Sequence, residues 1–373
     1  MAGAKVVHFT VVHRPFDTRI FQKECRTLVR EGYRVALVAP HTRREVVDGV
    51  EIVPLPRFPN RLVRMGWGAW VAGWIVHRLR GDLYHFHDPE LLPVGLLLKR
   101  STSAPVIYDV HEDYPRLFAA KEWLPRSLRG GAARLVERLE KRACRRLDGF
   151  VAATETIARR FPPDKTRVVR NYPSLSVTQW VSEDRRRYEG NYTLIYTGGW
   201  TVYRGVYQIV QALGYVTVPQ ARLVLLGSMS SPRLAEAARE LPGYERVEYL
   251  GKVPYREMYR YLNEAAVGLV CNQPVHGYQF ALPNKLFEYM AAGLPVIASN
   301  FDLWREIVEG NECGVTVDPT SPRRIAEAID DLLNRPDARR VMGRNARQAI
   351  RDKYNWEQES RKLVGLYEEV LSR

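Results

Sequence analysis

Two charged residues, Lys285 and Glu288, stand in the stretch ALPNKLFEYMAAGLPVIAS (residues 281–299), whose other residues mostly suit burial. Pro283 precedes an expected helix. The amides of residues 282–286 would then lie at a helix N-terminus, where unpaired N–H groups and the helix dipole favour an anion such as a diphosphate. Glu288 follows about one turn later, where a carboxylate can accept hydrogen bonds from a ribose diol.

A second cluster with the same chemistry lies in YTGGWTVYRGVYQIV, where an expected strand ends in Gly198-Gly199 and a helix begins near Arg204. The glycines allow the backbone to approach a ligand closely, and the Arg204 guanidinium can bind phosphate oxygens in a bidentate way. Two anion sites suit a nucleoside diphosphate. Taken singly, Gly198-Gly199 could be only a turn, and Glu288 could only pair with Lys285 on a helix surface.

Both clusters need parallel strands to position them. Runs such as KVVHFTVV, YRVALVAP and PVIYDVH alternate with amphipathic stretches in the first half, and the pattern restarts with YTLIYTGG. The runs lack strict polar alternation, as expected of parallel strands covered on both faces. This predicts an α/β protein with two doubly wound, Rossmann-like domains, whose ligands bind at the carboxyl ends of the strands.

The restart also sets the expected domain boundaries. We expect an N-terminal domain over residues 1–175, a polar linker over 176–190 and a C-terminal domain over 191–355. A final amphipathic helix over 356–373 is expected to pack toward the N-terminal domain. A chain of 373 residues is longer than one hydrophobic core usually serves, which agrees with two domains.

The net charge of +14 is concentrated in the first half. Residues 1–180 carry 31 Lys and Arg against 18 Asp and Glu, whereas the rest carry 25 against 24. This asymmetry suggests that the first half meets an anionic membrane surface, a phosphorylated acceptor or nucleic acid, and the alternative is that the charge only keeps the protein soluble. Four widely spaced cysteines argue against a disulfide framework and against a zinc site, so a cytoplasmic location is expected.

Several motifs carry a resemblance to a known family. YTGGW...YRG, LGKVPYREMYRYL, LPNKLFEYMAAGLPVIAS and ECGVTVDPTSPRRIAEAI occur in that order, after DTRIFQKECRTLVREGYRVALVAP, HFHDPELLP, YDVHEDYP and VVRNYP. In these motifs, which span nearly all of the chain, the sequence resembles the retaining glycosyltransferases of family 4, which have the GT-B fold. The resemblance implies two Rossmann-like domains facing a cleft, and transfer of a hexosyl group from a nucleotide-diphosphate sugar to an acceptor hydroxyl.

The resemblance also assigns residues to the donor. Glu288 matches the second glutamate of a family motif in which seven residues separate two glutamates, and it would bind the ribose. Arg204 matches the basic residue that neutralises the diphosphate, and residues 251–254 match the loop that cradles the base. The implied nucleotide-sugar set is Gly198, Gly199, Arg204, Lys252, Val253, Leu282, Pro283, Asn284, Lys285 and Glu288.

Two positions depart from the family pattern. Phe280 stands where the first glutamate of the motif would contact the donor sugar, and Trp200 stands where many members have an arginine. The phosphate charge would then fall to Arg204 and Lys285. No cofactor is implied beyond the substrate, a UDP or GDP sugar, and the implied pathway is the synthesis of a cell-surface polysaccharide or glycolipid.

In the N-terminal half, the resemblance places His111 of YDVHEDYP at the cleft, where it would bind a donor sugar hydroxyl or a backbone carbonyl near the anomeric carbon. The alternative is a histidine that caps a strand end and satisfies local backbone groups. Glu112 follows in a strand-to-helix loop of the kind that carries sites, and it is expected at the acceptor. The expected catalytic residues are His111, Arg204 and Lys285.

Two further motifs allow more than one interpretation. His85 and His87 of HFHDPE share a strand face, but no third histidine or distant carboxylate is seen to complete a metal site, so no metal is expected. Asp88 is expected either to contact the acceptor or to cap the following helix. In HRPFDTRIF, Asp17 and Arg19 could bind the acceptor, or Asp17 could cap a helix while Arg19 is solvated.

The implied chemistry is a front-face displacement that retains configuration. The diphosphate departs, an oxocarbenium-like centre forms, and the acceptor hydroxyl attacks from the same face while the leaving phosphate takes its proton. The protein then supplies charge stabilisation of the leaving group in a closed, dry cleft.

A membrane partner is a further possibility. Trp67, Trp70 and Trp74 recur at helical spacing between arginines, a pattern that favours an interfacial helix on anionic lipid and a lipid-linked acceptor. The alternative is that these tryptophans line the acceptor cleft or pack against the sheet. If the first interpretation holds, the protein is peripheral at the inner face of the plasma membrane.

Two other functions compete with sugar transfer. A nucleotide-sugar epimerase of the same fold would use the donor pocket without an acceptor. A basic nucleic-acid-binding protein is suggested by charge alone, without a binding motif, so no specific nucleic acid is expected as a partner.

Overall fold

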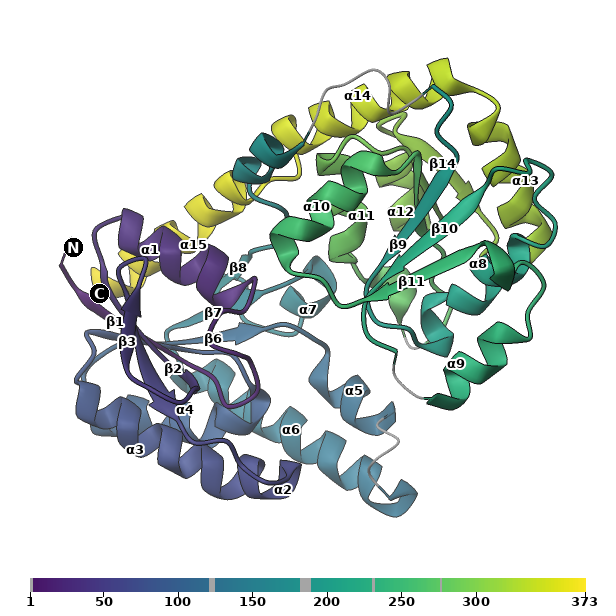
Figure 1. Ribbon diagram of the computed structural model, residues 1–373. Coiled ribbons are helices and arrows are strands. Elements are labelled where there is room, and N and C mark those ends of the chain that lie inside the picture. Colours follow the sequence, from purple (N-terminus) through teal and green to yellow (C-terminus); the bar gives the residue numbers. More distant parts are fainter. Residues whose placement is uncertain (1–2, 121–124, 182–188, 230–231, 276) are drawn as a thin grey trace. The chain divides into compact units, whose positions relative to one another are not determined.

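The computed structural model describes residues 3–120, 125–181, 189–229, 232–275 and 277–373. These residues fall into two compact units. Unit 1 comprises Met1–Asn171 and Trp356–Arg373, and unit 2 comprises Tyr172–Asn355. Each unit is built around one sheet (Figure 1).

The sheet of unit 1 has the strand order β3-β4-β2-β1-β5-β6-β7-β8, and every pair except β3–β4 is parallel. The order reverses between β1 and β5, which is where doubly wound sheets bind ligands. The strands are β1 (Lys5–Phe9), β2 (Arg34–Pro40), β3 (Glu45–Val47), β4 (Val50–Leu55), β5 (Leu83–Phe86), β6 (Val106–Val110), β7 (Gly149–Ala152) and β8 (Thr166–Val168).

Helices cover both faces of this sheet (Figure 1). Helices α3, α4 and α6 form an apolar core with β1 side chains such as Val7 and Phe9, whereas η1, α1 and α15 pack around Val6 and Leu37 on the other face. The C-terminal helix α15 therefore completes unit 1. The helices are η1 (Ile20–Cys25), α1 (Arg26–Arg30), α2 (Arg61–Val63), η2 (Arg64–Gly68), α3 (Ala69–Leu79), η3 (Pro89–Leu91), α4 (Leu92–Ser101), α5 (Tyr114–Ala120), α6 (Arg126–Arg146), α7 (Glu155–Ala158) and α15 (Trp356–Leu371).

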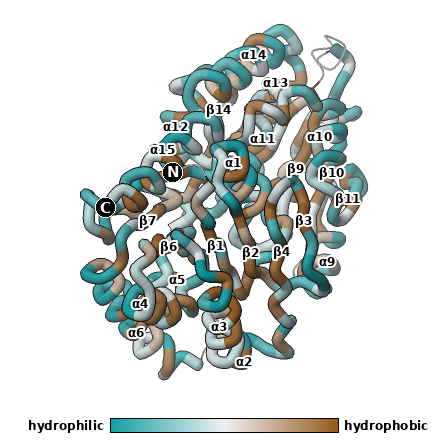
Figure 2. Tube along the Cα trace, turned by 90° about the vertical axis from the view of Figure 1, so that its left-hand side faces the viewer, coloured by the Kyte–Doolittle hydropathy of each residue, from teal (hydrophilic) through white to brown (hydrophobic). Residues whose placement is uncertain are grey.

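The sheet of unit 2 has the order β11-β10-β9-β12-β13-β14 and is parallel throughout. Its order reverses between β9 and β12. Figure 2 shows that strands such as β2 and β10 are mostly hydrophobic, while α14 alternates between hydrophilic and hydrophobic residues. The strands are β9 (Thr193–Thr197), β10 (Arg222–Leu226), β11 (Val247–Gly251), β12 (Val267–Val270), β13 (Val296–Ser299) and β14 (Gly314–Val317).

Two apolar cores hold helices against the faces of this second sheet. One contains residues of α8 and α13, and the other contains residues of α10, α11, α12 and α14. The helices are η4 (Leu175–Trp180), η6 (Val202–Arg204), α8 (Val206–Ala212), α9 (Pro232–Arg239), η7 (Tyr244–Arg246), α10 (Tyr255–Glu264), η8 (Tyr278–Phe280), α11 (Asn284–Ala291), α12 (Asp302–Val308), α13 (Pro322–Leu333) and α14 (Pro336–Asp352).

The prediction of two parallel, doubly wound α/β sheets is confirmed, as is a C-terminal helix on the N-terminal unit. The β3–β4 hairpin was not predicted, although its turn Asp48-Gly49 carried a signal. Both turn residues have positive φ, 51° and 80°, which the Asp-Gly sequence favours in two-residue hairpin loops. Of the expected linker over 176–190, residues 182–188 lie outside the described residues.

Candidate active site

The glycine pair of unit 2 lies at the carboxyl end of β9, at the reversal of strand order. Gly198 adopts φ 116°, a backbone conformation that side chains with a Cβ rarely adopt. Gly205 follows at φ 72° as the N-cap of α8, and a Cβ there would meet the Cys271 carbonyl oxygen. The sequence therefore requires glycine at both turns, and it brings the backbone from β9 past Arg204 into α8.

Arg204 and Lys285 lie on the same side of this turn, although they are 81 positions apart in the chain. A Cβ built on Gly198 would lie 3.5 Å from Arg204 Nη1 and 3.8 Å from Lys285 Nζ. Arg204 Nη1 donates to the Gly199 carbonyl oxygen at 3.4 Å. Two cationic side chains thus meet at the carboxyl end of β9, where an anion would compensate both.

Lys285 is buried on the first turn of α11, 8% exposed, and its Nζ has no hydrogen-bond partner in the described part of the chain. The ammonium lies 3.5 Å from the centre of the Tyr196 ring. Burial, reinforced by the Arg204 charge, holds the pKa of Lys285 well below its usual value of 10.5. An anion beside Lys285 would raise this pKa back toward its usual value.

Glu288 lies one turn after Lys285 on α11, as expected, and it is half-buried. Burial, followed by the charge of Glu288 and a hydrogen bond to it, raises the pKa of Tyr255. Glu288 also contributes an opposing charge to Lys285. Arg204, Lys285 and Glu288 therefore lie in one neighbourhood of unit 2 rather than on unrelated surfaces.

The other expected donor residues border the same helix N-terminus or the β11–α10 loop. Pro283 is the N-cap of α11 in an extended conformation, which places Asn284 at the first helical position. In the β11–α10 loop Lys252 is exposed and Val253 is half-buried. Leu282 packs against the apolar core that contains α11.

The two departures from the family pattern have different structural consequences. Trp200 is 2% exposed and packs edge-on against Tyr249, with ring centres 5.2 Å apart, so it fills space in the core. Phe280 is 50% exposed at the end of η8. A phenyl ring there supplies no acceptor for sugar hydroxyls.

In unit 1, the expected catalytic residue His111 follows β6 and bonds to a buried carboxylate. Its Nε2 lies 2.8 Å from Asp109 Oδ2, which also lies 3.1 Å from His87 Nδ1. Burial would raise the pKa of Asp109, but the charge of Arg19 and bonds to both histidines hold it well below its usual value. Because His111 Nε2 faces this carboxylate, Nδ1 is the ring nitrogen that can act as an acceptor toward a ligand. Glu112, next in the chain, is exposed.

The alternative of a solvated Arg19 is wrong, because Arg19 is 5% exposed. Its Nε and Nη2 donate to Asp109 at 3.0 and 2.9 Å, and its Nη1 donates to the Val169 carbonyl oxygen at 2.9 Å. Asp17 Oδ1 accepts from the backbone N–H of Arg19 and Ile20, so it caps the start of η1. Arg19 is buried because it pairs with the buried Asp109 of β6. No local sequence pattern indicated this contact.

Asp88 does not cap the helix after it, since its side chain makes no capping hydrogen bond there. It is 2% exposed, and its Oδ2 accepts from Thr10 Oγ1 and from the backbone N–H of Val11 and Val12. It thereby fixes the loop after β1. The capping alternative is therefore wrong.

The argument that nothing completes a metal set around His85 and His87 is also wrong. His8 of β1 pairs in register with His85 of β5, and Glu24 of η1 lies against the same face. Tyr367 of α15 contacts both His8 and His85 through its hydroxyl group. Only the strand pairing and the return of the C-terminal helix bring these residues together.

The three tryptophans at helical spacing do not pack against the sheet, which corrects that alternative. Trp67, Trp70 and Trp74 are 67%, 58% and 58% exposed on η2 and α3, and Arg78 lies over the ring of Trp74. No helix within the described residues is long and apolar enough to cross a bilayer.

Comparisons with known proteins agree with this architecture. A model described as glycosyl transferases group 1 matches residues 181–349, and one described as a glycosyl transferase 4-like domain matches residues 18–172. Glycogen synthase of Mycobacterium tuberculosis is 23% identical over 338 residues, covering 84% of this chain and 78% of the relative. A phosphatidyl-myo-inositol mannosyltransferase of Mycolicibacterium smegmatis is 23% identical over 356 residues, covering 91% and 86%.

Solved structures share the fold over the whole chain. Sucrose-phosphate synthase from Thermosynechococcus elongatus superposes with a TM-score of 0.80 at 19% identity, covering 99% of both chains. HepE from Anabaena in complex with UDP-glucose superposes with a TM-score of 0.73 at 13% identity, covering 98% of this chain and 100% of that one. From the two family matches and this fold, the chain belongs to the group 1, family 4-like glycosyltransferases, a retaining family with the GT-B fold.

Proposed function

We propose that this glycosyltransferase binds the diphosphate of a nucleotide sugar between Gly198-Gly199, Arg204 and Lys285, and transfers the sugar to an acceptor hydroxyl. The observation that carries the proposal is the buried Lys285 ammonium, which has no hydrogen-bond partner among the described residues and lies beside Arg204 at the carboxyl end of β9. Two adjacent cations are stabilised by a doubly charged ligand. A relative that binds UDP-glucose supports a nucleoside diphosphate as that ligand.

Each residue then has a physical role in transfer. Arg204 and Lys285 stabilise the charge that develops on the leaving diphosphate, and the α11 N-terminus adds its dipole. Glu288 accepts hydrogen bonds from the ribose diol. Because His111 presents Nδ1 as an acceptor, it can receive a hydrogen bond from a donor sugar hydroxyl. The leaving phosphate takes the acceptor proton, so no protein nucleophile is needed.

Ligand-dependent stabilisation tests the donor assignment. UDP, GDP and ADP, each beside its monophosphate, should be compared by thermal shift, because a ligand at 100 times its Kd stabilises the folded state by about 2.7 kcal/mol. We expect one diphosphate to raise Tm well above its monophosphate. If no diphosphate raised Tm of the wild type more than its monophosphate does, the diphosphate pocket would be abandoned.

Product analysis separates transfer from epimerisation. With the preferred nucleotide sugar, a transferase releases the nucleoside diphosphate in step with glycosylation of the acceptor. An epimerase converts the sugar with no acceptor present. We expect little sugar conversion without acceptor, and a new sugar formed at full rate in its absence would favour the epimerase.

An anionic membrane is proposed as the second partner, through the surface formed by Trp67, Trp70, Trp74 and Arg78. Three tryptophans that are each more than half exposed are unusual on a solvated helix, and the basic excess of residues 1–180 complements anionic lipid. Interfacial helices use this combination of rings and cations. The acceptor would then be lipid-linked, in the synthesis of a glycolipid or a cell-surface polysaccharide. A relative named as a phosphatidyl-myo-inositol mannosyltransferase supports this class.

A further inference from the structure

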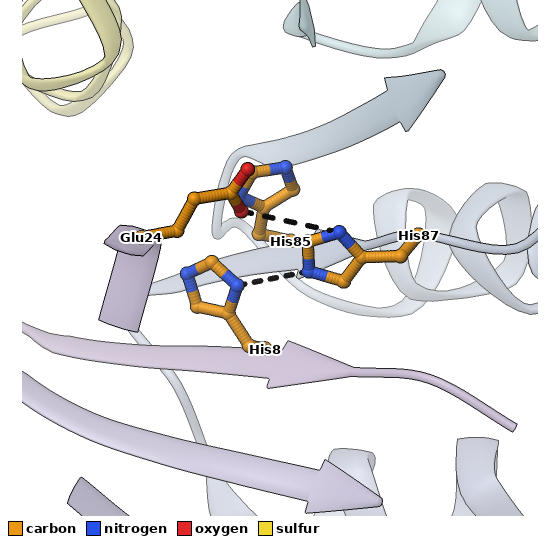
Figure 3. A group of neighbouring side chains, drawn as sticks. All are labelled: His8, Glu24, His85 and His87. Carbon is orange, nitrogen blue, oxygen red and sulfur yellow. Dashed lines mark hydrogen bonds and ion pairs between the residues drawn. The ribbon is translucent and has the colours of Figure 1, made fainter. Parts of the chain in front are cut away.

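A cluster of three histidines and one glutamate lies inside unit 1, whereas the proposed donor site belongs to unit 2. His8, Glu24, His85 and His87 are fully buried, and each offers one ligand atom within 4.8 Å of the others (Figure 3). They come from β1, from η1, from β5 and from the residue just after β5. Figure 3 shows the four side chains pointing toward one another. Four chain segments thus converge on one point.

Two members of this histidine cluster have atoms without hydrogen-bond partners among the described residues. His85 Nε2 has no hydrogen-bond partner among the described residues, and the two carboxyl oxygens of Glu24 lack one of good geometry, although Glu24 interacts with Asp109. Glu24 Oε1 does lie 2.9 Å from Arg19 Nε, but this nitrogen already donates to Asp109. Glu24 Oε2 lies 4.0 Å from His87 Nδ1, the nitrogen that also bonds to Asp109. Buried polar atoms without partners are rare and need a ligand or another explanation.

The outer nitrogen of each ring is held by an oxygen atom. His87 Nδ1 lies 3.1 Å from Asp109 Oδ2, and His85 Nδ1 and His8 Nε2 lie 2.5 and 3.0 Å from Tyr367 Oη. This leaves His8 Nδ1, His85 Nε2 and His87 Nε2 for the centre of the cluster. Metal-ligating histidines almost always have their second nitrogen bonded to an oxygen in this way.

The spacing of the inner atoms also suits a metal ion. His8 Nδ1 and His87 Nε2 are hydrogen-bonded to each other at 3.0 Å, a bond that an ion between them would replace. In a tetrahedral zinc site with Zn–N bonds of 2.0–2.1 Å, ligand nitrogens lie about 3.3 Å from each other. A small adjustment of the two rings would therefore admit an ion between them.

We propose that His8, His85, His87 and Glu24 bind a divalent transition-metal ion, with Zn²⁺ as the best match, in a closed structural site. Three imidazoles and one carboxylate favour Zn²⁺ and similar ions over Mg²⁺ or Ca²⁺, which prefer oxygen ligands. Four protein ligands without exposure leave no open position for substrate. The ion would join β1, β5 and η1, and through Tyr367 it would fix α15 to the sheet.

Metal content and geometry test this site in the full-length chain. The protein should be produced without a polyhistidine tag in minimal medium supplied with Zn²⁺ or Co²⁺, because a buried site is loaded during folding. Expected results are one metal ion per chain by elemental analysis and the strong visible absorption of tetrahedral Co²⁺. Metal well below one equivalent after growth in either supplement, or the weak spectrum of octahedral Co²⁺, would overturn the proposal.

Variants distinguish this cluster from adventitious surface binding. Glu24→Gln keeps the side-chain volume and should lose most of the bound metal, as should His85→Ala. His77→Ala removes an exposed histidine of α3 and should retain one equivalent. Because His85→Ala could fail to fold, the folding of each variant is checked by circular dichroism. The metal content of folded Glu24→Gln is then the deciding measurement. A folded Glu24→Gln protein with undiminished metal and an unchanged Co²⁺ spectrum would contradict the proposal.

Discussion

The Lys285 ammonium lies 3.5 Å from the centre of the Tyr196 ring and donates no hydrogen bond within the described residues. Lys285 belongs to α11 and Tyr196 to β9, so the contact joins the two elements that frame the proposed diphosphate site. The face of an aromatic ring attracts a cation, but it stabilises the charge less than a hydrogen-bonded anion would. The charged form of Lys285 is therefore poorly stabilised until an anionic ligand binds. This affects protein stability, turnover and proton uptake.

Lys285→Met should increase stability while lowering turnover. Methionine fills a similar volume without a charge to desolvate, so Tm should rise, whereas loss of charge stabilisation in the transition state should lower kcat by about 10²-fold. Denaturant unfolding and initial rates on the same preparation check both effects. If Lys285→Met were less stable than the wild type, burial of the lysine would not cost the folded protein stability.

Nucleoside diphosphate binding should take up a proton through Lys285. The pKa of Lys285 is well below 10.5 in the free protein, and a neighbouring phosphate raises it. Calorimetric titrations in buffers of different ionisation enthalpy, at a pH above the lowered pKa, measure this uptake. The Lys285→Met variant should show none, and equal uptake in both proteins would assign the proton to another group.

The same shift predicts how stability varies with pH. Because the folded protein releases the Lys285 proton at lower pH than the unfolded chain, the unfolded state binds more protons between the native pKa and 10.5. The free energy of unfolding therefore rises with pH across that window because of Lys285. This stabilising contribution disappears as the pH falls through the native pKa. In urea-unfolding experiments, the free energy of unfolding of Lys285→Met should rise less steeply with pH than that of the wild type.

Arg204→Ala should lower turnover about 10²–10³-fold, the cost of removing one preorganised charge donor, and change stability by less than about 0.5 kcal/mol. The small stability effect is expected because, among the described residues, the Arg204 side chain makes a single long hydrogen bond, to the Gly199 carbonyl oxygen. Arg222→Ala, at the amino end of β10, is the matched control and should keep its rate. A wild-type rate in folded Arg204→Ala protein would refute the assignment.

Glu288→Gln should weaken nucleotide binding rather than chemistry. Hydrogen bonds to a charged group contribute about 1.5–3 kcal/mol, which corresponds to about 10- to 100-fold in KM for the donor. Glu264→Gln, on an exposed position of α10, provides the comparison. If kcat fell and KM stayed constant, Glu288 would act on the reacting centre instead of the ribose.

The exposed tryptophans should matter only where lipid is present. Replacing Trp67 and Trp74 by Ser should reduce sedimentation with anionic vesicles at low salt and leave transfer to a water-soluble acceptor unchanged. Val341→Ser, which changes an exposed residue of α14 in unit 2, should bind as the wild type does. If the wild type did not sediment with anionic vesicles even at low ionic strength, the proposed membrane association would be wrong.

Local patterns were sufficient for the elements that position the donor site. The expected strands at KVVHFTVV, YRVALVAP and YTLIYTGG appear as β1, β2 and β9, since buried parallel strands are continuous apolar runs. Gly293 follows α11 at φ 69°, the left-handed conformation that favours glycine just after a helix. The spacing of Lys285 and Glu288 on one helix also followed from the chain alone, because neighbours on a helix are neighbours in sequence.

Tertiary structure alone decided which distant residues meet. Whether Arg204 lies beside Lys285 depends on β9 lying next to β12 in the sheet, with α11 packed against them, and whether Arg19 is buried depends on Asp109 of β6. His8 and Glu24 join His85 only because β1 pairs with β5 while η1 covers their shared face. The sequence determined the fold through short-range apolar periodicity, whereas long-range contacts arise from strand order and packing, which no local pattern encodes.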